Sequence, residues 1–149
     1  MALVAAAAVS ALLLAGCGSD EPAASGSAAP SAVSAGPQVL LDAQELTVLD
    51  QPLKYLKKKP AQVTSSILTL DPGQETGWHK HPSPIYVYIL EGAISVEYDA
   101  GVVKEYQSGT AFLEAVGTWH NGTNKGDVPV RILVVNMGAK GVENSVKRP

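Results

Sequence analysis

The chain has 149 residues, 46% of them hydrophobic, so it has room for one domain with a buried core. Its formal net charge of −3 gives no excess of positive charge to attract the phosphates of nucleic acid, so nucleic-acid binding is not expected. The one cationic run, Lys57 to Lys59, is more typical of a solvated linker or strand edge than of a contact with anionic headgroups.

Residues 1–16 have the composition of a secretory signal peptide. From residue 2 onward they are almost entirely Ala, Leu and Val, an apolar run too short to span a bilayer as a stable helix. No Lys or Arg precedes this run, which suggests an initiator upstream of Met1. A buried core helix is the weaker alternative, because the segment that follows has nothing to bury.

The apolar run ends in Leu14-Ala15-Gly16-Cys17, which resembles the bacterial lipobox. The resemblance implies that the Cys17 thiol carries a diacylglycerol and that Cys17 becomes the first residue of the mature protein. We therefore expect an extracytoplasmic protein that a lipid anchors to the cell membrane or the outer membrane. Because Cys17 is the only cysteine, the domain has no disulfide.

Two segments separate Cys17 from the expected domain. Residues 17–37 consist mainly of Gly, Ser, Ala and Pro, so they are expected to form a disordered tether. Residues 38–61 read as an N-terminal arm, with a possible short strand at Leu46–Leu49, that completes a sheet or crosses to a partner subunit. Either this arm or a sheet edge is expected to support a homodimer.

Short apolar runs separated by Gly, Pro, Asp or Asn predict an all-β domain over residues 62–138. The expected strands are 63–70, 85–90, 94–98, 102–106, 111–116 and 130–136. Alternation in 94–98 places Ile94, Val96 and Tyr98 on one face of the strand. Strands at this spacing, with no amphipathic helix of useful length between them, favour a sandwich or barrel. Residues 139–149 are expected to be a loose C-terminal tail.

The chain contains three histidines, and their spacing predicts a metal site. His79 and His81 are two residues apart, and residues at this spacing point to the same face of a strand. His120 follows in a second Gly-punctuated segment, and a tryptophan directly precedes each group, Trp78 and Trp119. A lone histidine is usually a surface or satisfied core residue, but three with none elsewhere favour metal binding by imidazole.

These two segments resemble the paired motifs of the cupin superfamily. The first motif, Gly, five residues, His-x-His, then Glu, six residues and Gly, is matched by Gly73, His79, His81 and Gly92. The second is matched by Gly109, Gly117, His120 and Asn124. The resemblance covers about residues 62–137 and implies a single cupin jelly roll, a double-stranded β-helix barrel, with His79, His81 and His120 as metal ligands.

The chain departs from the family pattern at two positions. Ala115 stands where the turn proline is expected, and Gly117 still supplies the tight turn. Ile85 stands where the metal-binding Glu is expected. Without that carboxylate a divalent ion keeps its full charge, with up to three positions open to anionic oxygen ligands. Glu114 and Tyr86 are the candidates for a fourth ligand or a catalytic group, and Glu114 is equally well interpreted as hydrogen-bonding a histidine.

The sequence leaves the identity of the metal open among Fe, Mn, Ni, Cu and Zn, because imidazole suits most of them. Release of the metal is expected as the pH falls through the histidine range near 6. The cupin resemblance slightly favours iron or manganese and includes three-histidine dioxygenases. Two functions follow: a dioxygenase-like enzyme acting on a small organic acid or phenolic, or a non-catalytic lipoprotein that binds a metal or small ligand for sensing.

Overall fold

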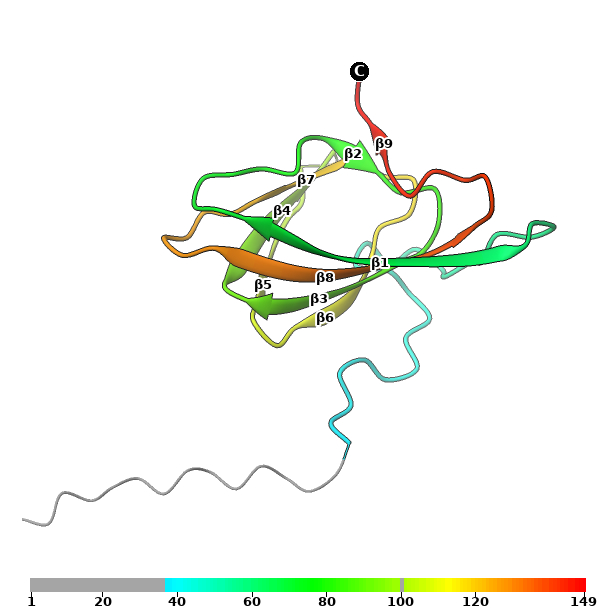
Figure 1. The fold of residues 1–149 in the computed structure, drawn as a ribbon, viewed down its shortest axis with the longest axis horizontal. Coiled ribbons are helices and arrows are strands. Elements are labelled where there is room, and N and C mark those ends of the chain that lie inside the picture. The colour runs from blue at the N-terminus through cyan, green and yellow to red at the C-terminus, as the bar shows by residue number, and fades with distance from the viewer. Residues whose placement is uncertain (1–36, 100) are drawn as a thin grey trace, which may run out of the picture. The chain divides into compact units, whose positions relative to one another are not determined.

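The computed structural model describes residues 37–99 and 101–149, which form an all-β domain (Figure 1). Its strands are β1 (Ala61–Leu70), β2 (His79–Lys80), β3 (Ile85–Glu91), β4 (Ala93–Tyr98), β5 (Val103–Gln107), β6 (Ala111–Glu114), β7 (His120–Thr123), β8 (Val130–Ala139) and β9 (Val146–Lys147). The predicted jelly roll is confirmed. The predictions for residues 1–36, namely the signal peptide, the lipid on Cys17 and most of the tether, concern residues outside those that the structure describes.

The strands form two antiparallel sheets. One has four strands in the order β1-β8-β3-β6, and the other has five in the order β5-β4-β7-β2-β9. The long β1 and β8 pair along their whole lengths, from Ala61 opposite Ala139 to Leu70 opposite Val130. Neighbours in the sheets are mostly distant in the sequence, so each sheet assembles from segments across the whole domain.

Apolar side chains at every second position of the strands form the core between the sheets. Ile94, Val96 and Tyr98 of β4, which the sequence placed on one face, are all buried. Ile85, Val87 and Ile89 of β3 are also buried and face them from the other sheet. Burial of these apolar side chains is the main stabilising contribution to such a fold.

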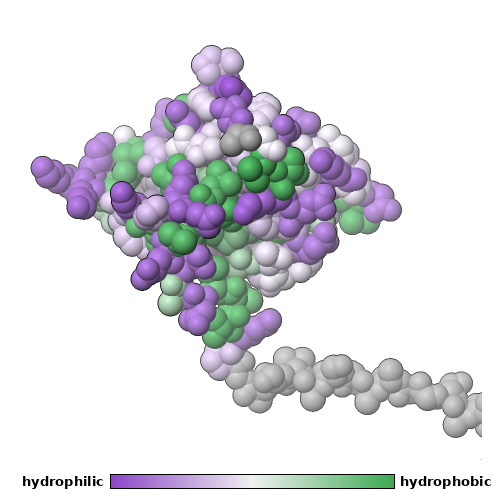
Figure 2. All heavy atoms as spheres, turned by 180° about the vertical axis from the view of Figure 1, so that it is seen from behind, coloured by the Kyte–Doolittle hydropathy of each residue, from purple (hydrophilic) through white to green (hydrophobic). Residues whose placement is uncertain are grey.

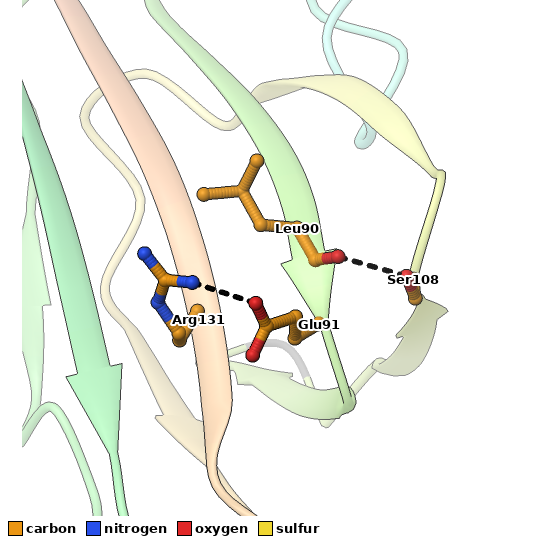
Figure 3. Close-up of polar contacts among 4 residues, drawn as sticks. All are labelled: Leu90, Glu91, Ser108 and Arg131. Atoms are coloured by element: carbon orange, nitrogen blue, oxygen red, sulfur yellow. Dashed lines mark hydrogen bonds and ion pairs between the residues drawn. The ribbon is translucent and has the colours of Figure 1, made fainter.

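Polar side-chain contacts link neighbouring segments at the end of the barrel where β3 finishes (Figure 3). The register of β3 against β8 shifts between Ile89 and Glu91, and Arg131 forms an ion pair of 2.6 Å with Glu91. Ser108 Oγ donates a hydrogen bond of 3.0 Å to the Leu90 carbonyl. Gly92 follows with φ of +72°, and a Cβ there would lie 2.8 Å from the Pro129 carbonyl oxygen. Only glycine fits this turn.

The arm before β1 packs on the domain through Val48 and Leu49, which contact the core, and through the hydrogen bonds of Gln51. Gln51 Nε2 donates to the Val116 carbonyl, and Gln51 Oε1 accepts from the Val116 amide. The expected strand at Leu46–Leu49 is wrong, since Leu46 forms only an isolated bridge with Pro52. Thr47 instead caps a turn, with its Oγ1 accepting from the Gln51 amide at 3.3 Å.

The C-terminal segment is more ordered than the loose tail that the sequence predicted. Its residues Val146 and Lys147 form β9, which lies beside β2 (Figure 1). Arg148 secures the strand, because its amide donates to the Trp78 carbonyl and its guanidinium pairs with Asp99 at 3.0 Å. The guanidinium also lies over the rings of Trp78 and Trp119, a cation–π arrangement. These partners are distant in sequence, so local composition did not reveal them.

Apolar side chains also reach the surface. Figure 2 shows them as separate patches among polar residues on the face seen from behind. The exposed set includes Val39, Tyr55, Val63 and Ile67. Among the described residues no helix has the length and hydrophobicity needed to cross a membrane.

Candidate metal centre

Pairing of two short strands brings the three histidines together. His79 in β2 lies directly opposite His120 in β7, and directly opposed residues of an antiparallel pair share a face. His81 follows two residues after His79 and forms a bridge with Val116. Pro82 and Pro84 come next, and proline cannot continue a strand ladder, so β2 stays short.

Each imidazole is oriented by a backbone carbonyl. The Nδ1 atoms of His79, His81 and His120 lie 2.7, 2.8 and 2.9 Å from the carbonyl oxygens of Gly77, Asn144 and Thr118, respectively. A carbonyl only accepts, so Nδ1 carries the proton in each ring and Nε2 presents its lone pair. Such a second hydrogen bond is the usual way in which proteins fix the tautomer of a metal-binding histidine.

The distances suit one ion. One ring nitrogen from each histidine lies within 4.8 Å of the others, and the ring centroids are 4.4 to 5.0 Å apart. Two ligands at about 2.1 Å from a metal span at most ~4.2 Å, so small ring rotations would complete the site. The residues therefore fit a divalent transition metal.

Burial keeps these imidazoles neutral. Desolvation lowers the pKa of His81 and of His120 to about 4 and also lowers the pKa of His79. The hydrogen bonds to backbone carbonyls oppose this effect but do not cancel it. Neutral imidazole is the form that binds metal, so at pH 7 the site needs no loss of protons before an ion binds.

Two rows of side chains face each other across the barrel. The histidine row crosses the five-stranded sheet as Tyr98, His120, His79 and Lys147, each directly opposite the next. The facing row crosses the other sheet as Glu114, Ile85 and Asn136. Except for Tyr98, all of these residues line one cavity of about 390 Å³, whose remaining wall is mainly aliphatic.

Ile85 is buried and faces the cavity, as the motif spacing predicted for the position of the missing glutamate. Its neighbour in the facing row, Glu114, is 5% exposed and also lines the cavity. Glu114 is not part of the cluster of three histidine nitrogens in the described structure. Glu114 thus reaches the cavity from the other sheet, and its role as a fourth ligand stays a prediction.

The Glu114 carboxyl is held by two donors. The Tyr98 hydroxyl donates to Glu114 Oε1 at 2.8 Å, and the Ala115 amide donates to the same oxygen at 2.7 Å. Proline, which the motif expects at position 115, has no N–H, so this departure from the family supplies a donor. Burial raises the pKa of Glu114 to about 7, and these hydrogen bonds limit the rise. Burial also raises the pKa of Tyr98.

Tyr86 lies on the opposite side of β3 from Ile85 and Val87 and is not among the residues that line the cavity. Trp78 and Trp119 lie outside that lining as well and contact Arg148 instead. Asn124, the last residue of the second motif, is structural, since its Nδ2 donates to the Leu70 and Val128 carbonyls.

Sequence reasoning missed three polar groups around the cavity. Lys147 and Asn144 were assigned to a loose tail, and Asn136 to the end of an ordinary strand. Asn136 is 6% exposed, and its Oδ1 has no hydrogen-bond partner among the described residues. The only available signal was an asparagine inside an otherwise apolar run, which does not indicate which face of the strand it occupies.

Residues 66–136 match the family model described as Cupin domain. The match lies within the folded domain, whose architecture is a cupin-type jelly roll. The match contains all three histidines and most of the strands of both sheets. A search of curated protein sequences found no match to the chain.

Solved structures agree on the fold. An oxalate decarboxylase from Lactobacillus farciminis is 21% identical with a TM-score of 0.50, over 57% of this chain and 26% of that chain. A DMSP lyase structure is 17% identical with a TM-score of 0.51, over 58% of this chain and 44% of that chain. This chain thus spans less than half the length of either protein, and identities this low establish a shared fold alone.

Proposed function

We propose that this cupin-type domain binds one divalent transition metal through His79, His81 and His120 and acts on a small organic acid or phenolic bound beside it. The observation that carries the proposal is the convergence of three imidazoles, two buried and one half-buried, at the wall of a cavity, each with its Nδ1 proton directed at a backbone carbonyl. A bound ion would supply Lewis acidity and, if it is iron or copper, access to oxygen chemistry.

The protein's own groups give the site its selectivity. Three neutral imidazoles leave the charge of a divalent ion uncompensated, so anionic oxygen donors are the preferred ligands. Ile85 and the aliphatic wall exclude water from one side of the site. Glu114, with its pKa near neutrality, is the candidate group to accept or donate a proton in the cavity.

The direct test is metal analysis of the purified protein, followed by titration with Fe(II), Mn(II), Ni(II), Cu(II) and Zn(II). The expected result is one ion per chain for the wild type and greatly weakened binding for each single His→Ala variant. Protein that carries none of these metals and takes none up would refute the proposal. Oxygen consumption with β-diketones, hydroxy acids and phenolics then tests the dioxygenase-like reaction.

The alternative is a non-catalytic protein that captures or senses a metal or small ligand. A cluster of three histidines without a carboxylate is compatible with this function as well as with catalysis. The two functions differ in what happens to a bound ligand. A binding protein returns it unchanged after many hours with metal and oxygen, whereas an enzyme releases a product.

We also propose that the domain is extracytoplasmic and lipid-anchored through Cys17. The support is the Leu14-Ala-Gly-Cys17 sequence behind an apolar run. Mass spectrometry of the mature amino terminus should find a diacylated cysteine, and a Cys17→Ala variant should leave the membrane fraction. A mature chain that starts elsewhere would contradict the anchor.

A homodimer is the third part of the proposal. β1 is the edge of its sheet and exposes Val63 and Ile67 at 66% and 54%, a surface that edge pairing with a second copy would cover. Light scattering should give twice the monomer mass at micromolar concentration. A monomer at high micromolar concentration would exclude it.

A further inference from the structure

The C-terminal strand places a lysine beside the metal-binding cluster. Lys147 in β9 lies directly opposite His79 in β2, and both line the cavity. Directly opposed residues of an antiparallel pair have Cβ atoms roughly 5 Å apart and project from the same face. An ammonium group is therefore available within one side-chain length of the histidines.

In the part of the chain that the structure describes, no carboxylate forms an ion pair with this ammonium. Among residues 37–99 and 101–149 two ion pairs form, Glu91 with Arg131 and Asp99 with Arg148, and neither includes Lys147. Of the acids that line the cavity, Glu75 accepts from Asn121 Nδ2 at 2.9 Å and pairs with β7 three residues from His120, which is about 10 Å along the strand. Glu114 belongs to the other sheet.

A second observation also indicates a polar ligand in the cavity. Asn136 lines the cavity from the facing row, is 6% exposed and has an unpartnered Oδ1. A buried polar group without a partner is destabilising, so native proteins rarely retain one. Because Oδ1 only accepts, a hydrogen-bond donor, either a water molecule or a hydroxyl group of the ligand, would remove this cost.

The apolar wall limits where a ligand can carry charge. Val87, Val96 and Phe112 line the cavity beyond the two rows, and an unpaired charge among them would be strongly unfavourable. The metal position and Lys147 are the two places where an anionic group is stabilised. Because they are neighbours in one row, a ligand that occupies both must be short.

We propose that the cavity binds a short dicarboxylate, with one carboxylate at the metal held by the three histidines and the second on the ammonium of Lys147. The inference rests on the proposed metal site and adds the ligand class and the residue that selects it. Lys147 distinguishes a dianion from a monoanion, whereas the histidines alone would accept either.

The test uses protein loaded with Co(II), whose visible spectrum reports a change in its ligands, titrated with acetate, malonate, succinate and glutarate. At least one dicarboxylate should bind the wild type at least tenfold more tightly than acetate. Lys147→Gln should lose that preference while its affinity for acetate changes little. Lys140→Gln removes the same charge from an exposed residue that does not line the cavity, so it should keep the preference.

Metal stoichiometry, measured first in each variant, separates the proposed metal site from the proposed dicarboxylate binding. Protein that takes up no cobalt would overturn the metal site and this inference together. One cobalt per chain without any preference for a dicarboxylate, or with a preference that survives in Lys147→Gln, would overturn the inference alone. Loss of the preference in Lys140→Gln would also overturn it, because the effect would then be one of net charge.

Discussion

The two ends of the barrel are built from the same strands but differ in what they bury. Where β3 ends, Ile89 and Val130 are fully buried, the buried Asn124 side chain is hydrogen-bonded, and the Glu91–Arg131 ion pair lies at the surface. Where β3 begins, the protein buries two histidines, a glutamate and an asparagine, and half-buries a third histidine. Burial of polar groups lowers stability. The end where β3 finishes therefore stabilises the fold, whereas the end where β3 begins, the histidine end, retains chemically active groups at a cost in stability.

Removing a histidine should have the largest effect, and it should be confined to the histidine end. His81→Ala should weaken metal binding by at least about 100-fold, since loss of an outer hydrogen-bond partner alone costs 10–100-fold. Titration calorimetry with Zn(II) or Co(II) measures the affinity, and thermal unfolding of the metal-free variant serves as its control. Unchanged affinity would show that His81 is not a ligand.

A substitution that creates a cavity at the opposite end should lower stability and leave metal binding nearly unchanged. Ile89→Ala should lower the free energy of unfolding by about 2–5 kcal/mol, because the side chain is fully buried and leaves a void. Metal affinity should stay within a factor of about two to three of the wild type. Urea unfolding and the same calorimetry check both. A large loss of metal affinity would mean that the two ends are coupled rather than separate.

The pH dependence of stability should be set by the histidine end. Between pH 6.5 and about 4 the unfolded chain protonates His81 and His120 whereas the folded chain does not, so metal-free protein loses stability as pH falls. Glu114, with its pKa raised to about 7, opposes this, because its contribution is lost as pH rises from 4.5 through 7. Two histidines outweigh one glutamate, so the net slope is positive.

Urea unfolding of the metal-free protein from pH 4 to 8 measures this slope, and His81→Gln should reduce it. The same lowered pKa values move the expected pH of metal release below the value near 6 that unperturbed histidines give. Stability that rises as pH falls below 6.5 would contradict the neutral, buried histidines.

Restoring the glutamate of the family motif tests how the facing row contributes. Ile85→Glu should tighten metal binding, about tenfold, by adding a carboxylate ligand, and it should destabilise the metal-free protein through a buried charge. If Glu114 already ligates the ion, Ile85→Glu should change little and Glu114→Gln should weaken the site. Affinity and metal-free stability of both variants, measured side by side, distinguish the two arrangements.

The smallest effect is expected at the exposed ion pair. Arg131→Ala should cost no more than about 1 kcal/mol, since both partners are substantially exposed and solvent screens their attraction. Metal affinity should not change. Thermal unfolding at low and high salt measures the cost, and a loss of several kcal/mol would mean that the contact shown in Figure 3 fixes the register of β3.

The sequence by itself determined the all-β fold, most strands and the three histidines. Apolar alternation encodes which residues of a strand are buried, so Ile94, Val96 and Tyr98 were correctly placed on one face. The His-x-His spacing likewise encodes a shared face, and glycines with positive φ, such as Gly92 and Gly117, mark turns that the motif spacing had already located. These signals are local, so they do not depend on knowing which strands are neighbours.

Only the tertiary structure decided what surrounds the histidines. Lys147, Asn136 and Asn144 reach the site because β9 pairs with β2 and β8 pairs with β3, and no periodicity in the sequence encodes which strands pair. The Ala115 N–H bond to Glu114 and the pKa values shifted by burial depend on the same assembly. Strand pairing between distant segments, set by the packing of the whole barrel, therefore turned a three-histidine motif into a cavity with its own charge and selectivity.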